Sequence, residues 1–222
     1  MTAAVAVRAY GPTTISPRPI TLLPPADRGA QESVEVNHLV ARHLAGDALA
    51  FGELVERYHG RLLNFTSRMV GDRECAEDLV QEAFFRVSRH LHRFDTKRKF
   101  STWVYTIVSN LAKNELRRQR RSPLVLFSSV SATDDDDRGP MQFADARDRP
   151  DDLLTARYHA DLVQATLARL PLLYREVLIL REFEGRSYDE IGELLGCRLG
   201  AVKSRLHRAR ITFVALVAPH LD

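Results

Sequence analysis

The stretch SYDEIGELLGCRLGAVKSRLHRAR (residues 187–210) carries two helical patterns separated by a glycine. Ser187 and Glu190 have the spacing of a capping box, which opens a short helix. Gly196 is placed to end that helix, because glycine tolerates the left-handed conformation of a helix C-terminus. A second helix then starts at about Gly200. A short helix, a glycine turn and a second helix form the helix-turn-helix pattern.

The second of these helices is strongly basic. Its apolar residues recur at near-helical spacing and are expected to face the core: Val202, Leu206, Ala209 and Phe213. The remaining surface carries Arg198, Lys203, Ser204, Arg205, His207, Arg208 and Arg210. A basic face that only keeps a helix soluble would usually include acids for pairing, and no acid lies between residues 196 and 213. The pattern therefore favours DNA contact, in which cations neutralise phosphates while a few side chains read base edges.

The composition of the chain is typical of a water-soluble protein. The 222 residues leave room for two small domains, and the net charge is +3 with a sequence pI of about 9.0. Cys75 and Cys197 are too far apart for a metal or redox motif. No apolar run approaches the roughly 18 residues of a membrane span, and the opening MTAAVAV is too short for a signal peptide. We expect a cytoplasmic protein without a metal site or cofactor.

Helical spacing also fills residues 36–121, upstream of an abrupt change in composition. Residues 77–91 form one amphipathic helix, and a further helix follows a loop, with Ser101 or Thr102 as its N-cap. Residues 122–152 read as an acidic flexible linker, and residues 1–35 as a disordered proline-rich extension. The predicted fold is therefore all-α, with two small helical domains, 36–121 and 153–222, the second a helix-turn-helix.

A second basic cluster lies within this loop and along the helix that comes after it. Its members are Arg93, Lys97, Arg98, Lys99, Lys113, Arg117, Arg118, Arg120 and Arg121, and the aromatic residues Phe94, Phe100, Trp103 and Tyr105 lie among them. Cations beside aromatic faces are typical of single-stranded nucleic acid sites, where bases stack and phosphates are neutralised. A core position remains the alternative for Phe100 and Trp103. The loop cations have only Asp95 as an acidic neighbour, which favours nucleic acid.

Three segments carry a resemblance to a known family: EDLVQEAFFRVSRHL, FSTWVYTIVSNLAKNELRRQRR and YREVLILREFEGRSYDEIGELLGCRLGAVKSRLHRAR. In order and spacing they resemble the extracytoplasmic-function (ECF) sigma factors of bacteria, over residues 46–213. The resemblance implies a protein that binds core RNA polymerase, directs it to specific promoters and helps to open the duplex. It implies no catalytic residue, cofactor, metal or small-molecule substrate, and an anti-sigma factor as a regulatory partner.

The resemblance also assigns roles to residues. The residues implied to bind the clamp coiled coil of the largest polymerase subunit are Asp78, Gln81, Glu82 and Arg86, and the polymerase flap is a further contact. The residues implied to bind the minus-ten element are Arg93, Phe94, Lys97, Arg98, Lys99, Asn110, Lys113, Asn114 and Arg117. The residues implied to bind the minus-thirty-five element are Ser187, Tyr188, Arg198, Lys203, Ser204, Arg205, His207 and Arg208. Residues 36–121 then correspond to sigma region 2, and residues 153–222 to sigma region 4.

Some features depart from the family or allow other interpretations. Ala201 removes a hydroxyl that could cap the recognition helix or touch phosphate. The acidic linker matches a segment that threads toward the polymerase active centre, with a solubilising spacer as the alternative. A dimeric helix-turn-helix repressor would need a dimerisation surface that the short chain end does not offer. An enzyme is disfavoured, because pairs such as Glu182 and Glu184 are two residues apart and point to different helix faces.

Overall fold

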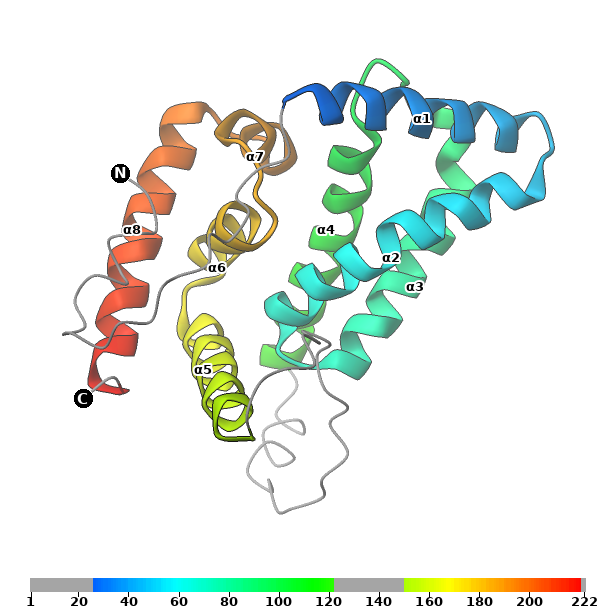
Figure 1. The fold of residues 1–222 in the computed structure, drawn as a ribbon. Coiled ribbons are helices and arrows are strands. Elements are labelled where there is room, and N and C mark those ends of the chain that lie inside the picture. The colour runs from blue at the N-terminus through cyan, green and yellow to red at the C-terminus, as the bar shows by residue number, and fades with distance from the viewer. Residues whose placement is uncertain (1–25, 122–149, 221–222) are drawn as a thin grey trace.

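The computed structural model describes residues 26–121 and 150–220, and every regular element within them is helical. Figure 1 shows two groups of helices side by side. The first unit contains α1 (Ala26–Leu44), α2 (Ala48–Val70), α3 (Arg73–His90), a 3-10 turn η2 (Leu91–Arg93) and α4 (Phe100–Arg121). The second unit contains α5 (Pro150–Arg169), α6 (Leu172–Leu178), the π-helical η4 (Ile179–Phe183), α7 (Tyr188–Leu195), α8 (Leu199–Val217) and η5 (Ala218–His220).

Caps and apolar stripes explain the helices of the first unit. The Asp47 side chain accepts a hydrogen bond from the backbone N–H of Leu49 at 3.0 Å and starts α2. Gly71 ends α2 in the left-handed conformation, with φ 86°, and Asp72 immediately caps α3. The stripe predicted on residues 77–91 is buried at each position: Val80, Ala83, Phe84, Val87 and Leu91. These side chains pack between α2 and α4, so the opposite face of α3 is exposed to solvent.

In the second unit, α8 packs against α5, α6 and α7. Val202, Leu206 and Ala209 are buried on its inner face, as the spacing predicted. Phe213 is only partly buried against the same core. Figure 1 places α8 at the outer side of the molecule, away from the first unit.

Three boundaries differ from the sequence prediction. Helix α1 begins at Ala26, inside the segment predicted to be disordered up to residue 35, and the ion pairs of Glu32 with Arg61 at 3.1 Å and of Glu35 with Arg57 at 2.7 Å join this upstream part to α2. Helix α5 begins at Pro150 rather than at residue 153. Helix α4 begins at Phe100, so neither Ser101 nor Thr102 is its N-cap. The rest of the predicted extension, residues 1–25, and of the predicted linker, residues 122–149, lies outside the described residues.

The two units share one hydrophobic core. Helix α4 packs against α7, and α2 packs against α5 and η4, so buried residues of both units belong to a single cluster. The guanidinium of Arg175, which is 4% exposed, donates to the Met69 carbonyl at the end of α2 at 2.6 Å. Gln164 donates to the neighbouring Arg68 carbonyl at 3.3 Å. These bonds satisfy carbonyls that a helix end leaves open and fix the second unit against α2.

Candidate nucleic-acid and polymerase interfaces

The helix-turn-helix of the second unit has the predicted construction. The Ser187 side chain accepts from the Glu190 N–H at 3.2 Å, and Glu190 accepts from the Ser187 N–H at 2.9 Å, which completes the capping box. Gly196 ends α7 with φ 61°. A Cβ on Gly192 would lie 2.9 Å from the Cys197 carbonyl oxygen, so glycine is needed for the close approach within the turn. The turn therefore fixes the angle at which α8 leaves α7.

Most of the predicted minus-thirty-five residues are exposed: Arg198 at the N-cap of α8, and Lys203, Ser204, His207 and Arg208 on its outer face. Three other basic or aromatic residues are engaged within the unit. Arg205 is half-buried and donates to the Cys197 sulfur at 3.6 Å, and Arg210 pairs with Glu182 at 2.6 Å. Tyr188 is half-buried beneath the Arg181 guanidinium. Ser187 is exposed, although its hydroxyl serves the capping box.

The loop after α3 presents four cations that the sequence assigned to DNA, namely Arg93, Lys97, Arg98 and Lys99, and all are exposed. Phe94 lies half-buried, with its ring centroid 5.5 Å from that of Phe100 and 5.2 Å from that of Trp103. Phe100 is 3% exposed, which places it in the core. The aromatic cluster therefore anchors the loop, and the cations project from it.

On α4, the residues assigned to the minus-ten element share one face by their spacing. Asn110, Asn114 and Arg117 are exposed, and Arg117 donates to Asn114 at 2.8 Å. Lys113 differs from them, because its ammonium lies 3.0 Å from Glu176 of the second unit and its side chain is 19% exposed. One edge of the predicted DNA-binding face of α4 is therefore exposed, and the second unit covers the other edge.

The residues that cover this edge were missed by the sequence analysis. Glu176, which is 1% exposed, also accepts a hydrogen bond from the Ser109 hydroxyl. Glu184 accepts from the Tyr105 hydroxyl. Burial raises the pKa of Glu184 above the usual glutamate range, although this hydrogen bond favours the ionised form. Burial likewise raises the pKa of Tyr105.

A third glutamate, Glu190, contacts the loop of the first unit. Lys99 donates to its carboxylate at 2.8 Å. Burial opposes ionisation of Glu190, but the hydrogen bonds from Lys99 and from the Ser187 backbone outweigh it and lower the pKa of Glu190 to about 2. Glu190 therefore caps α7 and joins the two units with the same carboxylate.

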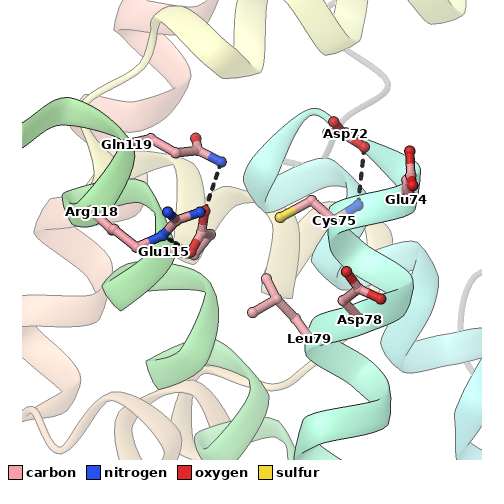
Figure 2. A pocket seen from close by; sticks show the side chains of 8 residues that line it. All are labelled: Asp72, Glu74, Cys75, Asp78, Leu79, Glu115, Arg118 and Gln119. Carbon is pink, nitrogen blue, oxygen red and sulfur yellow. Dashed lines mark hydrogen bonds and ion pairs between the residues drawn. The ribbon is translucent and has the colours of Figure 1, made fainter. Parts of the chain in front are cut away.

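The predicted polymerase-binding residues lie on the outer face of α3. Asp78, Gln81 and Arg86 are exposed, and Arg86 donates to Glu82 one turn away at 2.7 Å. Beside Asp78 lies a hollow of about 330 Å³ between α3 and α4 (Figure 2). Figure 2 shows Glu115 holding Arg118 on the α4 side, opposite Cys75.

The hollow offers little chemistry of its own. Burial raises the pKa of the Cys75 thiol, which keeps the sulfur protonated at neutral pH. Within the described ranges, no group of three His, Cys, Asp or Glu side chains is arranged to hold a metal ion. Within the same ranges, no helix is long and apolar enough to cross a membrane.

A helical unit with a loop and helix of exposed cations, followed by a helix-turn-helix unit, is the architecture of a sigma-70 type initiation factor. Residues 54–122 match the family model described as Sigma-70 region 2, and residues 160–212 match the one described as Sigma-70, region 4. ECF RNA polymerase sigma factor SigW of Bacillus subtilis (strain 168) is 34% identical over 165 residues, which are 74% of this chain and 87% of that protein.

A second relative and a solved structure are also similar to this chain. RNA polymerase sigma-H factor of Pseudomonas aeruginosa is 39% identical over 174 residues, which are 78% of this chain and 88% of that protein. The structure of CnrH in complex with the cytosolic domain of CnrY superposes with a TM-score of 0.61 at 27% identity, covering 83% of this chain and 98% of that one. The chain belongs to the ECF sigma factors of the sigma-70 family.

Proposed function

We propose that this protein binds core RNA polymerase in the cytoplasm, directs it to specific promoters and promotes opening of the duplex, without catalytic chemistry of its own. The observation that carries the proposal is the acid-free, exposed basic face of α8 on a capped helix-turn-helix. In this assignment, α8 reads the minus-thirty-five element from the major groove. The loop cations and the exposed face of α4 bind the minus-ten element, where an unstacked base needs cations and a pocket to offset lost stacking.

The same proposal places the polymerase on α3. Asp78, Gln81 and Arg86 are exposed on the outer face of α3. A regulatory protein partner is also part of the proposal, because the similar protein CnrH was solved in complex with the cytosolic domain of CnrY.

Run-off transcription with core polymerase, on the DNA upstream of the protein's own gene, tests the function. We expect a discrete transcript that requires the protein and is lost when Asn110 and Arg117 are both changed to alanine. The matched control is Arg169→Ala, which removes an exposed cation from α5, outside the assigned DNA faces. Tight duplex binding by the free protein without any transcript would instead support a dimeric operator-binding regulator.

A further inference from the structure

We propose that Asn37 of α1 is a positioning residue for the minus-ten loop, which comprises residues 94–99 between η2 and α4. The proposal rests on the proposed function, because it takes this loop as a DNA-contacting element. It adds α1 to the minus-ten site as the support that holds the loop in place. The match to Sigma-70 region 2 covers residues 54–122, and α1 (Ala26–Leu44) precedes it.

Helix α1 reaches the minus-ten loop through the Asn37 side chain. The amide nitrogen Nδ2 of Asn37 donates to the backbone carbonyl of Thr96 at 3.2 Å. Figure 1 shows α1 running past the connection between α3 and α4, and α1 also packs against η2 and α4. Lys97 and Arg98 directly follow Thr96, so the bond fixes the backbone beside these two exposed cations.

The rest of the loop shows why a contact with α1 matters. Phe94 anchors the start of the loop, with its ring centroid 5.5 Å from that of Phe100. From Asp95 onward the loop is exposed until α4 begins. Asp95 forms a turn there, since its side chain accepts from the Lys97 N–H at 3.0 Å and its carbonyl accepts from the Arg98 N–H at 2.9 Å. These short-range bonds shape the turn, and the bond from Asn37 orients it relative to the helices.

Helix α1 is fixed firmly enough to orient the loop. Three of its residues are buried in the core of the first unit: Val36, Leu39 and Val40. Two ion pairs join it to α2, Glu35 with Arg57 at 2.7 Å and Glu32 with Arg61 at 3.1 Å. The backbone of Asn37 is therefore held by the core, and its side chain extends that support to the loop.

Asparagine is an unfavourable residue for the position that it occupies. Asn37 lies in the interior of α1, where asparagine is less favourable than alanine because its amide competes for backbone hydrogen bonds. Its side chain is half-buried, and its amide donates to the loop rather than to α1. The side chain therefore contributes to the loop and not to the helix that carries it.

A loop that is held before DNA arrives binds with a smaller loss of conformational freedom. Segments that become ordered only on binding reduce the affinity, and pre-organised segments do not. Capture of an unstacked base also requires the pocket and its cations to be in place together. The loss of one neutral hydrogen bond should therefore lower initiation about fivefold and weaken the discrimination between bases at the captured position.

Two substitutions of the full chain remove the contact. Asn37→Ala deletes the donor, and Asn37→Asp keeps the shape of the side chain but places an acceptor against the Thr96 carbonyl. The matched control is Asn64→Ala, which makes the same change at an exposed position on α2. Because alanine favours the helix at both positions, we expect both alanine variants to keep Tm within about 2 °C of the wild type.

The first measurement concerns the free protein and does not depend on promoter function. Amide hydrogen exchange, followed by NMR, reports how firmly the turn holds the Lys97 and Arg98 N–H groups. We expect exchange at these two amides to be about fivefold faster in both Asn37 variants. Asn64→Ala should exchange as the wild type does.

The second measurement is run-off transcription by the holoenzyme on templates that carry each single-base substitution of the minus-ten element. We expect Asn37→Ala to give about fivefold less transcript on the preferred template. The ratio between the best and the worst base should fall at the position with the strongest preference. Asn64→Ala should stay within about twofold of the wild type on every template.

Circular dichroism establishes that each variant is folded, and Asn37→Asp takes the place of an alanine variant that is not. Unchanged exchange at Lys97 and Arg98 would overturn the proposal, and so would faster exchange with unchanged base preference. A Tm lowered by more than about 5 °C, with an equal loss on all templates, would reveal a purely structural role for Asn37. If the wild type gives no transcript while the variants exchange faster, the loop contact stands and promoter function is refuted.

Discussion

Replacing Glu190 with glutamine should remove an acid-sensitive part of the stability of this protein. Glu190 accepts from the Ser187 N–H at 2.9 Å and from Lys99 at 2.8 Å, and both bonds favour the ionised carboxylate. Its pKa falls from 4.5 to about 2 on folding, after burial has opposed the shift. Because the folded-state pKa is depressed, the stabilisation is complete above the unfolded pKa of 4.5 and is lost as pH falls through 2.

The magnitude follows from the shift and from exposure. A difference of roughly 2.5 units corresponds to about 3 kcal/mol at 1.36 kcal/mol per unit. The Glu190 side chain is 24% exposed and that of Lys99 is 49% exposed, so solvent screening reduces the ion-pair share. We expect the free energy of unfolding of the wild type to exceed that of Glu190→Gln by about 2 kcal/mol at pH 7. More than half of this difference should be lost by pH 3.

Urea unfolding of both proteins at intervals between pH 7 and pH 3 measures the difference directly. Taking the difference cancels groups common to both chains, including Glu184, whose raised pKa has the opposite effect: its stabilisation is present below the unfolded value and is lost as pH rises. A gap between wild type and variant that stays constant over this range would refute the assignment of Glu190 as a bridging, ionised cap. Glu193→Gln, which removes the same charge from an exposed position on α7, is the matched control.

Four other substitutions in the helix-turn-helix have defined expected effects. Ser187→Ala should lower the free energy of unfolding by about 1 kcal/mol, because the capping box loses its hydroxyl. Thermal unfolding should then show a Tm that is lower by roughly 2–4 °C. Gly192→Ala should lower the free energy of unfolding by about 1–3 kcal/mol, because its Cβ would lie 2.9 Å from the Cys197 carbonyl oxygen. Gly200→Ala, whose Cβ would enter open space, should be neutral or stabilising in the same assay. Lys203→Ala should make the slope of log affinity against log salt for duplex DNA shallower by about 0.9, provided that Lys203 contacts one phosphate.

Much of the local structure was predictable because it depends on residues close in sequence. The capping box depends only on the spacing of three residues between Ser187 and Glu190. The left-handed conformation at Gly196 depends only on the backbone preference of glycine. The buried stripe of α8 follows from a helical period, and Val202, Leu206 and Ala209 are all buried as predicted. Family resemblance gave the order of the units and a role for each face. Those residue roles remain predictions.

The packing of one unit on the other was not predictable by the same reasoning. Ser109 and Glu176, or Tyr105 and Glu184, are far apart in the chain and carry no shared local pattern. A buried Arg175 on α6 reads in sequence as one more solvated cation. The early start of α1 was missed for a related reason, because the ion pairs that join it to α2, Glu32 with Arg61 and Glu35 with Arg57, link residues far apart in the sequence.

Lys113 shows why the covered edge matters for interpreting the site. The family resemblance assigns it to the DNA-binding face of α4 together with Asn110 and Arg117, and the structure leaves those two exposed. The ammonium of Lys113 instead lies 3.0 Å from the carboxylate of Glu176, which is 1% exposed. Replacing Lys113 with alanine would therefore remove both the proposed phosphate contact and an ion pair that joins the two units, so its effect on DNA binding would combine two causes. Substitutions of Asn110 and Arg117 test the proposed DNA site without disturbing this ion pair.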